Sequence, residues 1–320
     1  MTDGKVDARS FRTYRDVHHQ TGSQLLEQVV AQRTRLSERL ARIRTIVAVA
    51  SGKGGVGKSL VTANLATTLA SRGKSVAVLD ADLNGPSLAK MLGVSGSTLE
   101  DREQGVVPPA GLAGVRVMSM ELLQGDRDTP LRWKDPGTDT FLWQSSMETS
   151  ALREFLSDVN WGDSDYLLVD VPPGTDKIQR LLELIPQLPV VLLVTTPSEM
   201  SRSVVARSLR LVREAGVAKI ALASNMTDYV CPDCDHRHPL FRGEGDRELA
   251  DEYGLPLWVE IPFDPRLGED TDRGLSQILD NPESEVARAF AKLADRLEAH
   301  VRVSREPGPE PSDPEGGMVE

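Results

Sequence analysis

The sequence is poor in several features that would place it in a particular class of protein. Only two cysteines occur in 320 residues, so no disulfide framework is implied. The longest apolar run, 188–194, is far too short to span a bilayer. The segment 1–16 is polar and has no apolar core of the kind that signal peptides carry. These absences predict a cytoplasmic protein.

The chain also lacks an excess of positive charge. It contains 37 Lys and Arg against 48 Asp and Glu, which gives a formal net charge of −11. Such a balance argues against general electrostatic attraction to nucleic acid or to anionic lipid. We therefore expect no nucleic-acid partner and no membrane partner. The remaining composition is typical of a globular protein.

The most informative feature present is the segment 52–59, Gly-Lys-Gly-Gly-Val-Gly-Lys-Ser. A run typical of a buried strand, 45–51, precedes it, and a helical pattern at 60–70 follows it. This is the context that a phosphate-binding loop requires. Glycines let backbone N–H groups converge on phosphate oxygens, and the helix N-terminus adds its positive end. A glycine-rich turn that binds nothing is the alternative, which the spacing disfavours.

The loop residues divide into expected roles. Lys58 is expected to contact the β- and γ-phosphates of ATP, and the Ser59 hydroxyl to ligate Mg²⁺. The residues expected to bind the nucleotide are Gly52, Lys53, Gly54, Gly55, Val56, Gly57, Lys58, Ser59 and Leu60.

Three aspartates lie at the ends of apolar, strand-like runs. Asp80 and Asp82 end the run 75–82, and Asp170 falls within the run 165–173. A phosphate-binding loop needs an acidic residue on a neighbouring strand for Mg²⁺, and Asp170 is our first choice. We expect Asp82 to orient the attacking water, and Asp80 to support the metal site from the layer of residues around the metal ligands. The alternative is that strand-end aspartates only cap helices.

The body of the chain alternates strand-like and helix-like segments. Several of the runs are apolar on both faces, which predicts a sheet covered on both sides. The pattern indicates an α/β protein with a doubly wound, mostly parallel sheet that binds ligands at the carboxyl ends of its strands. The strand-like runs after the loop are 75–82, 115–120, 165–173, 190–197, 219–226 and 256–263.

Four segments are expected along the chain. Residues 1–21 are polar and unpatterned, and residues 304–320 form an acidic tail rich in Pro and Gly, so both are predicted to be disordered. Apolar residues at helical spacing predict an N-terminal helix over 22–44. The catalytic domain is expected to span 45–303.

At this point the loop and the aspartate segments resemble a known class. The two-lysine loop, Asp-Ala-Asp-Leu-Asn-Gly-Pro-Ser at 80–87 and Val-Asp-Val-Pro-Pro-Gly-Thr at 169–175 are similar to the deviant-Walker-A P-loop NTPases. That class includes the MinD division-site and ParA partition ATPases and the nitrogenase iron protein. The resemblance implies a homodimer in which Lys53 reaches the phosphates bound by the partner. Lys53, Lys58 and Asp82 are then the expected catalytic residues.

The two cysteines, Cys231 and Cys234, leave several interpretations open. Two thiolates do not complete a tetrahedral metal site. A symmetric dimer would supply four thiolates, enough for a [4Fe–4S] cluster or for zinc. Alternatively, His236 and His238 could complete a zinc site within one chain, or the pair could be a redox dithiol or inert. The spacing alone does not choose among these.

The surroundings of the cysteines resemble the Mrp/ApbC family of iron–sulfur cluster carriers over residues 46–302. The resemblance implies that Cys231 and Cys234 of two chains hold a labile [4Fe–4S] cluster, with ATP modulating its transfer to apo-proteins. The implied partners are a second copy of the chain, scaffold proteins and apo iron–sulfur clients. Asn225 matches an adenine-contacting asparagine, and Pro262 lies in a loop near the base. The matching segments, besides the two-lysine loop, are 117–120, 128–130, 147–155, 225–226, 231–234, 241–245 and 261–265.

The sequence departs from this family at three places. Leu60 stands where relatives usually have threonine, which removes a hydroxyl near the α-phosphate. Asp176 and Lys177 follow Thr175 where relatives usually have Gly-Asp, in the segment expected to sense the γ-phosphate. Many relatives carry a small N-terminal domain or a cysteine-rich N-terminal extension, where this sequence predicts only the helix over 22–44. In addition, residues 127–141 resemble a small insertion of unknown purpose.

Two competing functions are kept. A MinD/ParA-like positioning ATPase that binds DNA or membrane is motivated by arginines on one predicted helix, although a solvated helix surface explains them more simply. A P-loop ATPase with structural zinc at the cysteine pair is the other. The arginines concerned are Arg202, Arg207, Arg210 and Arg213.

Overall fold

The computed structural model describes residues 22–123, 140–231, 234 and 236–303. The two segments predicted to be disordered, 1–21 and 304–320, lie outside the described residues, and so do positions 127–139 of the predicted insertion. The predicted domain boundaries stay predictions.

The core of the described molecule is a sheet with the strand order β10-β8-β7-β1-β6-β2-β5, in which all neighbours on this path run parallel. A short strand, β9, pairs antiparallel with β8. The predicted doubly wound, mostly parallel α/β class is confirmed. The strands of this sheet are β1 (Ile43–Ser51), β2 (Val76–Asp80), β5 (Arg116–Met118), β6 (Ser164–Asp170), β7 (Val190–Thr195), β8 (Lys219–Val230), β9 (Arg237–Pro239) and β10 (Leu257–Phe263).

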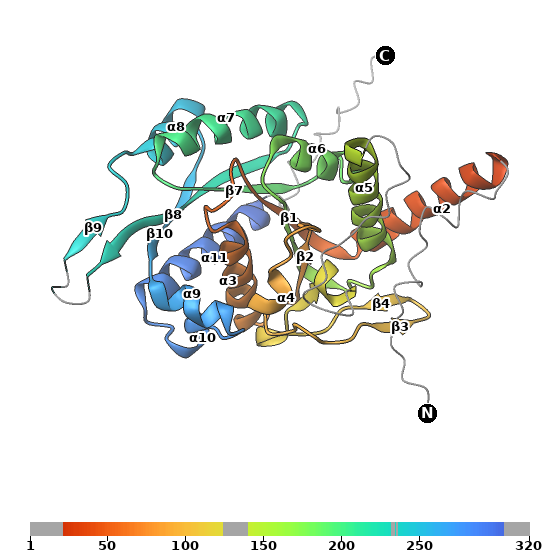
Figure 1. The fold of residues 1–320 in the computed structure, drawn as a ribbon, viewed down its shortest axis with the longest axis horizontal. Coiled ribbons are helices and arrows are strands. Elements are labelled where there is room, and N and C mark those ends of the chain that lie inside the picture. Colours follow the sequence, from red (N-terminus) through yellow and green to blue (C-terminus); the bar gives the residue numbers. More distant parts are fainter. Residues whose placement is uncertain (1–21, 124–139, 232–233, 235, 304–320) are drawn as a thin grey trace, which may run out of the picture.

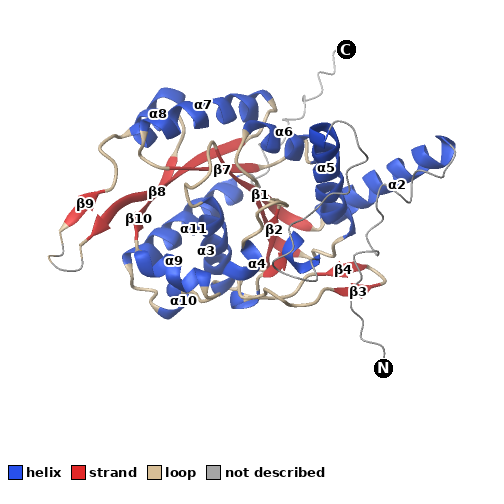
Figure 2. Cartoon of the chain, viewed as in Figure 1, coloured by secondary structure: helices blue, strands red, loops and turns tan. Residues whose placement is uncertain are grey.

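Helices cover both faces of the sheet, as Figure 1 and Figure 2 show. Strand β1 explains why: Val47 and Val49 belong to one buried apolar cluster, and the alternate residues Ala48 and Ala50 belong to the other. Both faces of the central strand must therefore be shielded from water.

One layer contains α3 (Lys58–Ser71), α4 (Leu88–Met91), α9 (Pro265–Asp272), α10 (Gln277–Asp280) and α11 (Glu285–Val303). The other contains α2 (Gly22–Ala41), α5 (Thr140–Asp158), α6 (Thr175–Leu184), α7 (Glu199–Glu214) and α8 (Gly245–Tyr253).

Three details differ from the sequence-based expectation. The strand predicted at 219–226 continues to Val230 and returns as β9, so it forms a hairpin that extends past the rest of the sheet (Figure 1). Residues 93–144, whose weak pattern predicts loops over the nucleotide face, contain a small antiparallel sheet, β3 (Glu100–Arg102) with β4 (Gly105–Val107), and the start of α5. Short 3-10 turns occur at Leu112–Gly114 and Met120–Leu123. Such short elements carry too few residues to show a clear periodicity.

The carboxyl ends of the central strands meet at one edge of the sheet, which we call the nucleotide edge. Strand β1 leads into the glycine-rich loop, β2 ends at Asp80, and β6 ends at Asp170. Asp80 and Asp170 are register partners on adjacent parallel strands. The topology therefore brings together three segments that are far apart in the sequence.

Candidate functional site

The glycine-rich loop has the backbone that phosphate binding requires. Gly55 and Gly57 adopt left-handed φ values of 77° and 81°, which residues other than glycine rarely adopt. Gly57 is also the residue from which α3 begins. A Cβ on Gly57 would lie 2.2 Å from the amide nitrogen of Asn225, whereas a Cβ on Gly55 would meet no atom within 4 Å. The loop is thus packed tightly at its end and open near its middle, where a phosphate can approach the backbone amides.

Asp170 is the centre of a buried polar network. Its Oδ2 lies 2.6 Å from Nζ of Lys58 and accepts a 2.7 Å hydrogen bond from Ser59 Oγ. Its Oδ1 accepts a 2.8 Å hydrogen bond from Thr62 Oγ1. A carboxylate beside a hydroxyl and a loop lysine is a donor set that suits a hard cation such as Mg²⁺ and the phosphates it accompanies. The residues predicted for metal and phosphate therefore lie together.

Asp80 lies behind this network and is fully buried. Its carboxylate accepts hydrogen bonds from the backbone N–H groups of Asp82, Ser87 and Leu88. Burial, and then the charge of Asp170, raise the pKa of Asp80 to about 7, well above the ordinary value for aspartate. Its oxygens are occupied by the turn that begins α4, which agrees with a supporting role rather than direct contact with a ligand.

Asp82 is half-buried and accepts a 3.0 Å hydrogen bond from the backbone N–H of Gly85. This bond closes the turn that follows β2. Asp82 also lines a cavity of about 230 Å³ together with Pro172 and Pro173, which follow β6. The residue predicted to orient water is therefore placed between the loops after β2 and β6.

Lys53, the additional lysine of the loop, contacts another part of its own chain. Its Nζ donates to Oγ of Ser198 over 3.3 Å, and Ser198 is the N-cap of α7. The preceding Gly52 packs so closely on α7 that a Cβ there would lie 2.7 Å from the backbone nitrogen of Val205. The start of the phosphate loop is thus attached to α7. The predicted contact of Lys53 with a partner's phosphates stays a prediction.

The residues predicted for the base occupy different surroundings. Asn225 on β8 is buried, and its amide nitrogen donates to the carbonyl oxygen of Val56 over 2.9 Å. Pro262 on β10 lines two cavities of about 600 and 480 Å³. Leu60 on α3 is partly buried and packs on the apolar cluster beneath the loop. Asn225 therefore holds the loop directly, and contact of any of the three with adenine stays a prediction.

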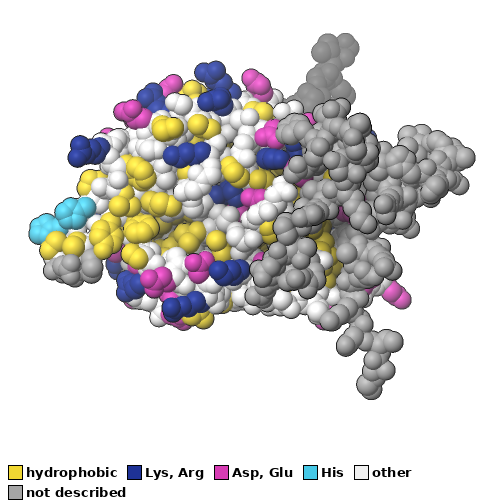
Figure 3. Space-filling model, in the orientation of Figure 1, with side chains coloured by type: hydrophobic (Ala, Val, Ile, Leu, Met, Phe, Trp, Pro, Cys, Tyr) yellow, Lys and Arg dark blue, Asp and Glu magenta, His cyan; other side chains and the backbone are white. Residues whose placement is uncertain are grey.

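The two cysteines lie at the tip of the β8–β9 hairpin, well away from the sheet's centre. Cys231 directly follows β8 and is half-buried, whereas Cys234 is exposed, and no disulfide joins them. The turn is held by a 3.0 Å hydrogen bond from the backbone N–H of Cys231 to the carbonyl oxygen of His236. Figure 3 shows histidine side chains at this end of the molecule and a band of apolar side chains that runs from there across the same face.

Within one chain, the described residues of the hairpin bring few metal-binding side chains together. Among the described residues, which leave out Pro232, Asp233 and Asp235, no three His, Cys, Asp or Glu side chains converge as a metal site would require. The rings of His236 and His238 are 6.5 Å apart, and Nδ1 of His236 lies 3.0 Å from the carbonyl oxygen of Cys234. The single-chain zinc site and the site shared with a second chain both stay predictions.

Three residues of the nucleotide edge were missed by sequence reasoning. Thr62 lies four positions after Lys58 on α3, so helical spacing alone could have placed it on the same face. Ser119 follows β5 and its Oγ lies 3.3 Å from Asp80 Oδ2. Ser198 could have been found as the hydroxyl that precedes a helical pattern.

Two of the four arginines on helix α7 contact α8, whereas Arg207 and Arg210 are exposed. Arg202 forms ion pairs with Glu248 at 2.8 Å and Glu252 at 2.6 Å on α8, and Arg213 lies over the ring of Tyr253. Within the described residues, no helix has the length and apolar character to cross a membrane.

Comparison with known proteins identifies a protein family and several relatives that this chain resembles. The family model described as NUBPL iron-transfer P-loop NTPase matches residues 42–298. An iron-sulfur cluster carrier protein of Saccharolobus solfataricus is 36% identical over 273 residues, which cover 85% of this chain and 88% of the relative. A cytosolic Fe-S cluster assembly factor NUBP1 homolog of Caenorhabditis briggsae is 34% identical, over 83% of this chain and 84% of its own.

Solved structures show the fold and its nucleotide chemistry in relatives. A nucleotide-binding protein of Archaeoglobus fulgidus, solved in complex with ADP, has a TM-score of 0.65 at 34% identity, covering 81% of this chain and 96% of its own. The cell division ATPase MinD of Pyrococcus furiosus has a TM-score of 0.54 at 25% identity, covering 80% and 99%. The family match and the extent of these similarities show that this chain belongs to the iron-transfer P-loop NTPases, the family of the iron–sulfur cluster carriers, with a fold of the MinD/ParA type.

Proposed function

We propose that this protein is an ATP-hydrolysing carrier that binds a [4Fe–4S] cluster between two copies of the chain and delivers it to apo-proteins. The observation that carries the proposal is the placement of Cys231 and Cys234 at an exposed tip of β8, the strand that also contacts the phosphate loop. The family to which the chain belongs and the relatives named as cluster carriers support it.

The nucleotide edge fits ATP and Mg²⁺. The open backbone near Gly55 and the N-terminus of α3 suit phosphate oxygens, and Lys58 supplies a charge within the same site. Ser59 and Asp170 would hold the metal, which supplies charge neutralisation for phosphoryl transfer. Lys58 would exchange its present contact with Asp170 for contacts to phosphate oxygens. Asp82 would orient the attacking water from the turn that Gly85 closes.

The cysteine hairpin fits a cargo that must be released. Two thiolates per chain leave a cluster half-ligated until a second chain contributes its own pair. Because Cys234 is exposed and Cys231 half-buried, a partner hairpin can reach both sulfurs. A site shared between chains opens when the chains move apart, which suits transfer to a client.

Strand β8 supplies a physical connection between the two sites. Asn225 holds the phosphate loop, and Cys231, directly after the end of β8, lies six residues further along the chain, a distance of about 20 Å if extended. Between them Met226 adopts a positive φ of 57°, and the pairing with β10 shifts register. A change at the loop would therefore reach the cysteines through one continuous segment.

The direct test is anaerobic reconstitution with iron and sulfide. Wild-type protein is expected to develop the thiolate-to-iron charge-transfer band, to bind about four iron atoms per two chains, and to run as a dimer. Cys231→Ser should lose the chromophore, and His238→Ala should keep it. An equal chromophore in Cys231→Ser would overturn the proposal.

Metal analysis distinguishes the competing site. Zinc retained by anaerobically purified monomer, and lost in His238→Ala, would replace the cluster with a single-chain zinc site. ATP hydrolysis is measured separately by phosphate release, so failure of the enzymatic part is distinguishable from failure of the cluster part. A location in the cytoplasm stays a prediction.

A further inference from the structure

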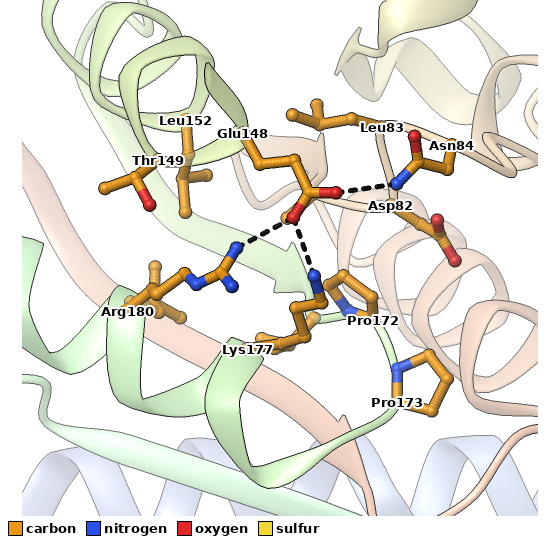
Figure 4. A pocket seen from close by; sticks show the side chains of 13 residues that line it. Asp82, Leu83, Asn84, Glu148, Thr149, Leu152, Pro172, Pro173, Lys177 and Arg180 are labelled. Atoms are coloured by element: carbon orange, nitrogen blue, oxygen red, sulfur yellow. Dashed lines mark hydrogen bonds and ion pairs between the residues drawn. The ribbon is translucent and has the colours of Figure 1, made fainter. Parts of the chain in front are cut away.

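A polar cluster outside the phosphate loop joins two segments of the nucleotide edge. It lies in the cavity of about 230 Å³ between the loops after β2 and β6 and the helices α5 and α6 (Figure 4). Its centre is Glu148, a residue of α5 with only 9% of its surface exposed. Helix α5 supplies no residue to the phosphate-binding network described above, so Glu148 has no evident role in holding the nucleotide.

Glu148 accepts hydrogen bonds from three side chains. Its Oε1 accepts from Nδ2 of Asn84 over 2.8 Å. Its Oε2 lies 2.6 Å from Nζ of Lys177 and 2.7 Å from a guanidinium nitrogen of Arg180. Burial opposes ionisation of Glu148, but the hydrogen bonds from Lys177, Asn84 and Arg180 and the charge of Lys177 together outweigh it and lower the pKa of the carboxyl. Glu148 is therefore an ionised group, satisfied on both oxygens.

The donors come from two different segments. Asn84 is two residues after Asp82, in the turn that the bond from Gly85 to Asp82 closes. Lys177 and Arg180 lie in the first turns of α6, directly after the segment 170–175. One carboxylate from α5 thus links the turn that carries Asp82 to the helix that follows Asp170. We call Glu148, Asn84, Lys177 and Arg180 the Glu148 clamp.

We propose that Glu148 is a positioning residue for ATP hydrolysis, which holds the Asp82 turn and the start of α6 in one fixed relation. The inference rests on the proposed ATPase function and deepens it. Water attack on the γ-phosphate requires Asp82 and the segment after Asp170 to face the same atom, and a displacement of about 1 Å can cost on the order of 100-fold in rate. Without the shared acceptor, each loop moves independently of the other.

The clamp acts on geometry rather than on nucleotide affinity. In Figure 4 the Asp82 carboxylate points away from Glu148, and the clamp residues approach one another across the cavity. In the described interactions the phosphate-binding contacts of Lys58 and Ser59 go to Asp170 and not to the clamp. Loss of the clamp should therefore lower kcat and leave binding by the phosphate loop intact.

Glu148→Gln tests the proposal because the amide keeps the size of the side chain and removes its charge. The expected result is a kcat about tenfold lower, with KM for ATP and Kd for ADP within about twofold of wild type. The matched control is Glu252→Gln, which neutralises a carboxylate paired with Arg202 on the surface. A rise in Kd for ADP as large as the fall in kcat would overturn the proposal. An equal fall in kcat in the control variant would do the same.

A double-mutant cycle separates the clamp from general damage. In Glu148→Gln/Lys177→Gln one of the two cations that paired with Glu148 is also removed, so the double variant should be no slower than Glu148→Gln alone. Independent effects would instead multiply, and that outcome contradicts a shared positioning role.

Amide hydrogen exchange gives a readout that does not depend on turnover. Glu148→Gln should speed exchange in both 82–88 and 172–177, whereas Asn84→Ala, an exposed residue and one arm of the clamp, should speed it only in 82–88. Unchanged exchange in both loops, or a change confined to α5, would refute the clamp. If wild-type protein hydrolyses no ATP, the proposed ATPase fails, and exchange alone decides the clamp.

Discussion

The nucleotide edge and the cysteine hairpin lie on the same sheet but differ in how far their polar groups are buried and paired within one chain. At the nucleotide edge Lys58 and Asp170 are 7% and 0% exposed and contact each other directly. At the hairpin Cys234 is exposed, and among the described residues no third ligand joins the two cysteines.

Desolvation explains this difference. A charged group buried without a partner is costly, so the loop lysine and its aspartate must be satisfied within the folded chain. An exposed thiol keeps its contact with water, so it needs no partner group within the folded chain. Buried charge therefore indicates a site that one chain assembles, and exposed thiols suit a site that two chains share.

The largest effect is expected at the nucleotide edge. Asp170→Asn leaves Lys58 in a buried site without its counter-charge, which should lower the free energy of unfolding by about 3–5 kcal/mol. Loss of the proposed metal ligand should also lower ATP hydrolysis by about 100-fold or more. Urea unfolding with a chelator present measures the first effect, and phosphate release measures the second.

Asp82→Asn is the matched control, because Asp82 is only half-buried and its turn can keep an amide oxygen as acceptor. Its free energy of unfolding should stay within about 1 kcal/mol of wild type. A similarly small loss in Asp170→Asn would remove the contrast between the two regions.

At the hairpin the expected effect falls on metal and not on stability. Cys231→Ser should retain less than about one tenth of the wild-type iron after anaerobic reconstitution, since a serine hydroxyl is a poor ligand for iron–sulfur clusters. Its unfolding midpoint and its affinity for ADP should match wild type. A clear loss of stability would show that the cysteine serves the fold of a single chain.

The pH dependence of stability sharpens the contrast further. The native pKa of Asp80, about 7, is above the unfolded value of about 4, so the folded chain keeps a proton that the unfolded chain releases. The free energy of unfolding therefore falls as pH rises from about 4 to 7 and levels off above that window.

Asp80→Asn should remove this slope and be the more stable protein above pH 7, by at most about 4 kcal/mol. Chemical unfolding of both proteins with a chelator at several pH values measures the difference. If the difference in free energy of unfolding between Asp80→Asn and wild type narrows as pH rises, the raised pKa of Asp80 is contradicted. Cys234→Ser, which alters only the exposed hairpin, should show the same slope as wild type.

The smallest effect is expected from an ion pair outside both regions. Glu252→Gln breaks the exposed pair with Arg202 between α7 and α8. Solvent screens such pairs, so the unfolding midpoint should not change beyond the error of the measurement. A larger change would mean that burial is not what makes the Lys58–Asp170 pair matter more for stability than an exposed pair.

Much of the candidate site was predictable because its signals are local. The glycine spacing of 52–59 defines a loop by backbone freedom alone, and Asp80 and Asp170 follow runs long enough to be recognised as strands. Asp170 was predicted as the principal carboxylate, and it is the residue that contacts both Lys58 and Ser59. The fold class followed from the same runs.

Other contacts could not be predicted, since they join positions far apart in the chain. The departure at Asp176 and Lys177 was linked only to the segment expected to sense the γ-phosphate, and in the structure Lys177 contacts Glu148 on α5. Lys53 was predicted to contact nucleotide phosphates, in its own chain or a partner, and its contact with Ser198 was not foreseen. The continuation of β8 to Val230 was missed because the run becomes more polar where it leaves the sheet.

The sequence by itself determined where the chemistry lies along the chain, because glycine freedom, strand-end aspartates and cysteine spacing act over a few residues. The tertiary structure alone decided which of these groups meet. It placed Asp80 beside Asp170, Asn225 against the phosphate loop, and the cysteines at the end of the same strand. The reason is that strand order and register arise from burying both faces of the sheet at once, a condition that no local segment contains.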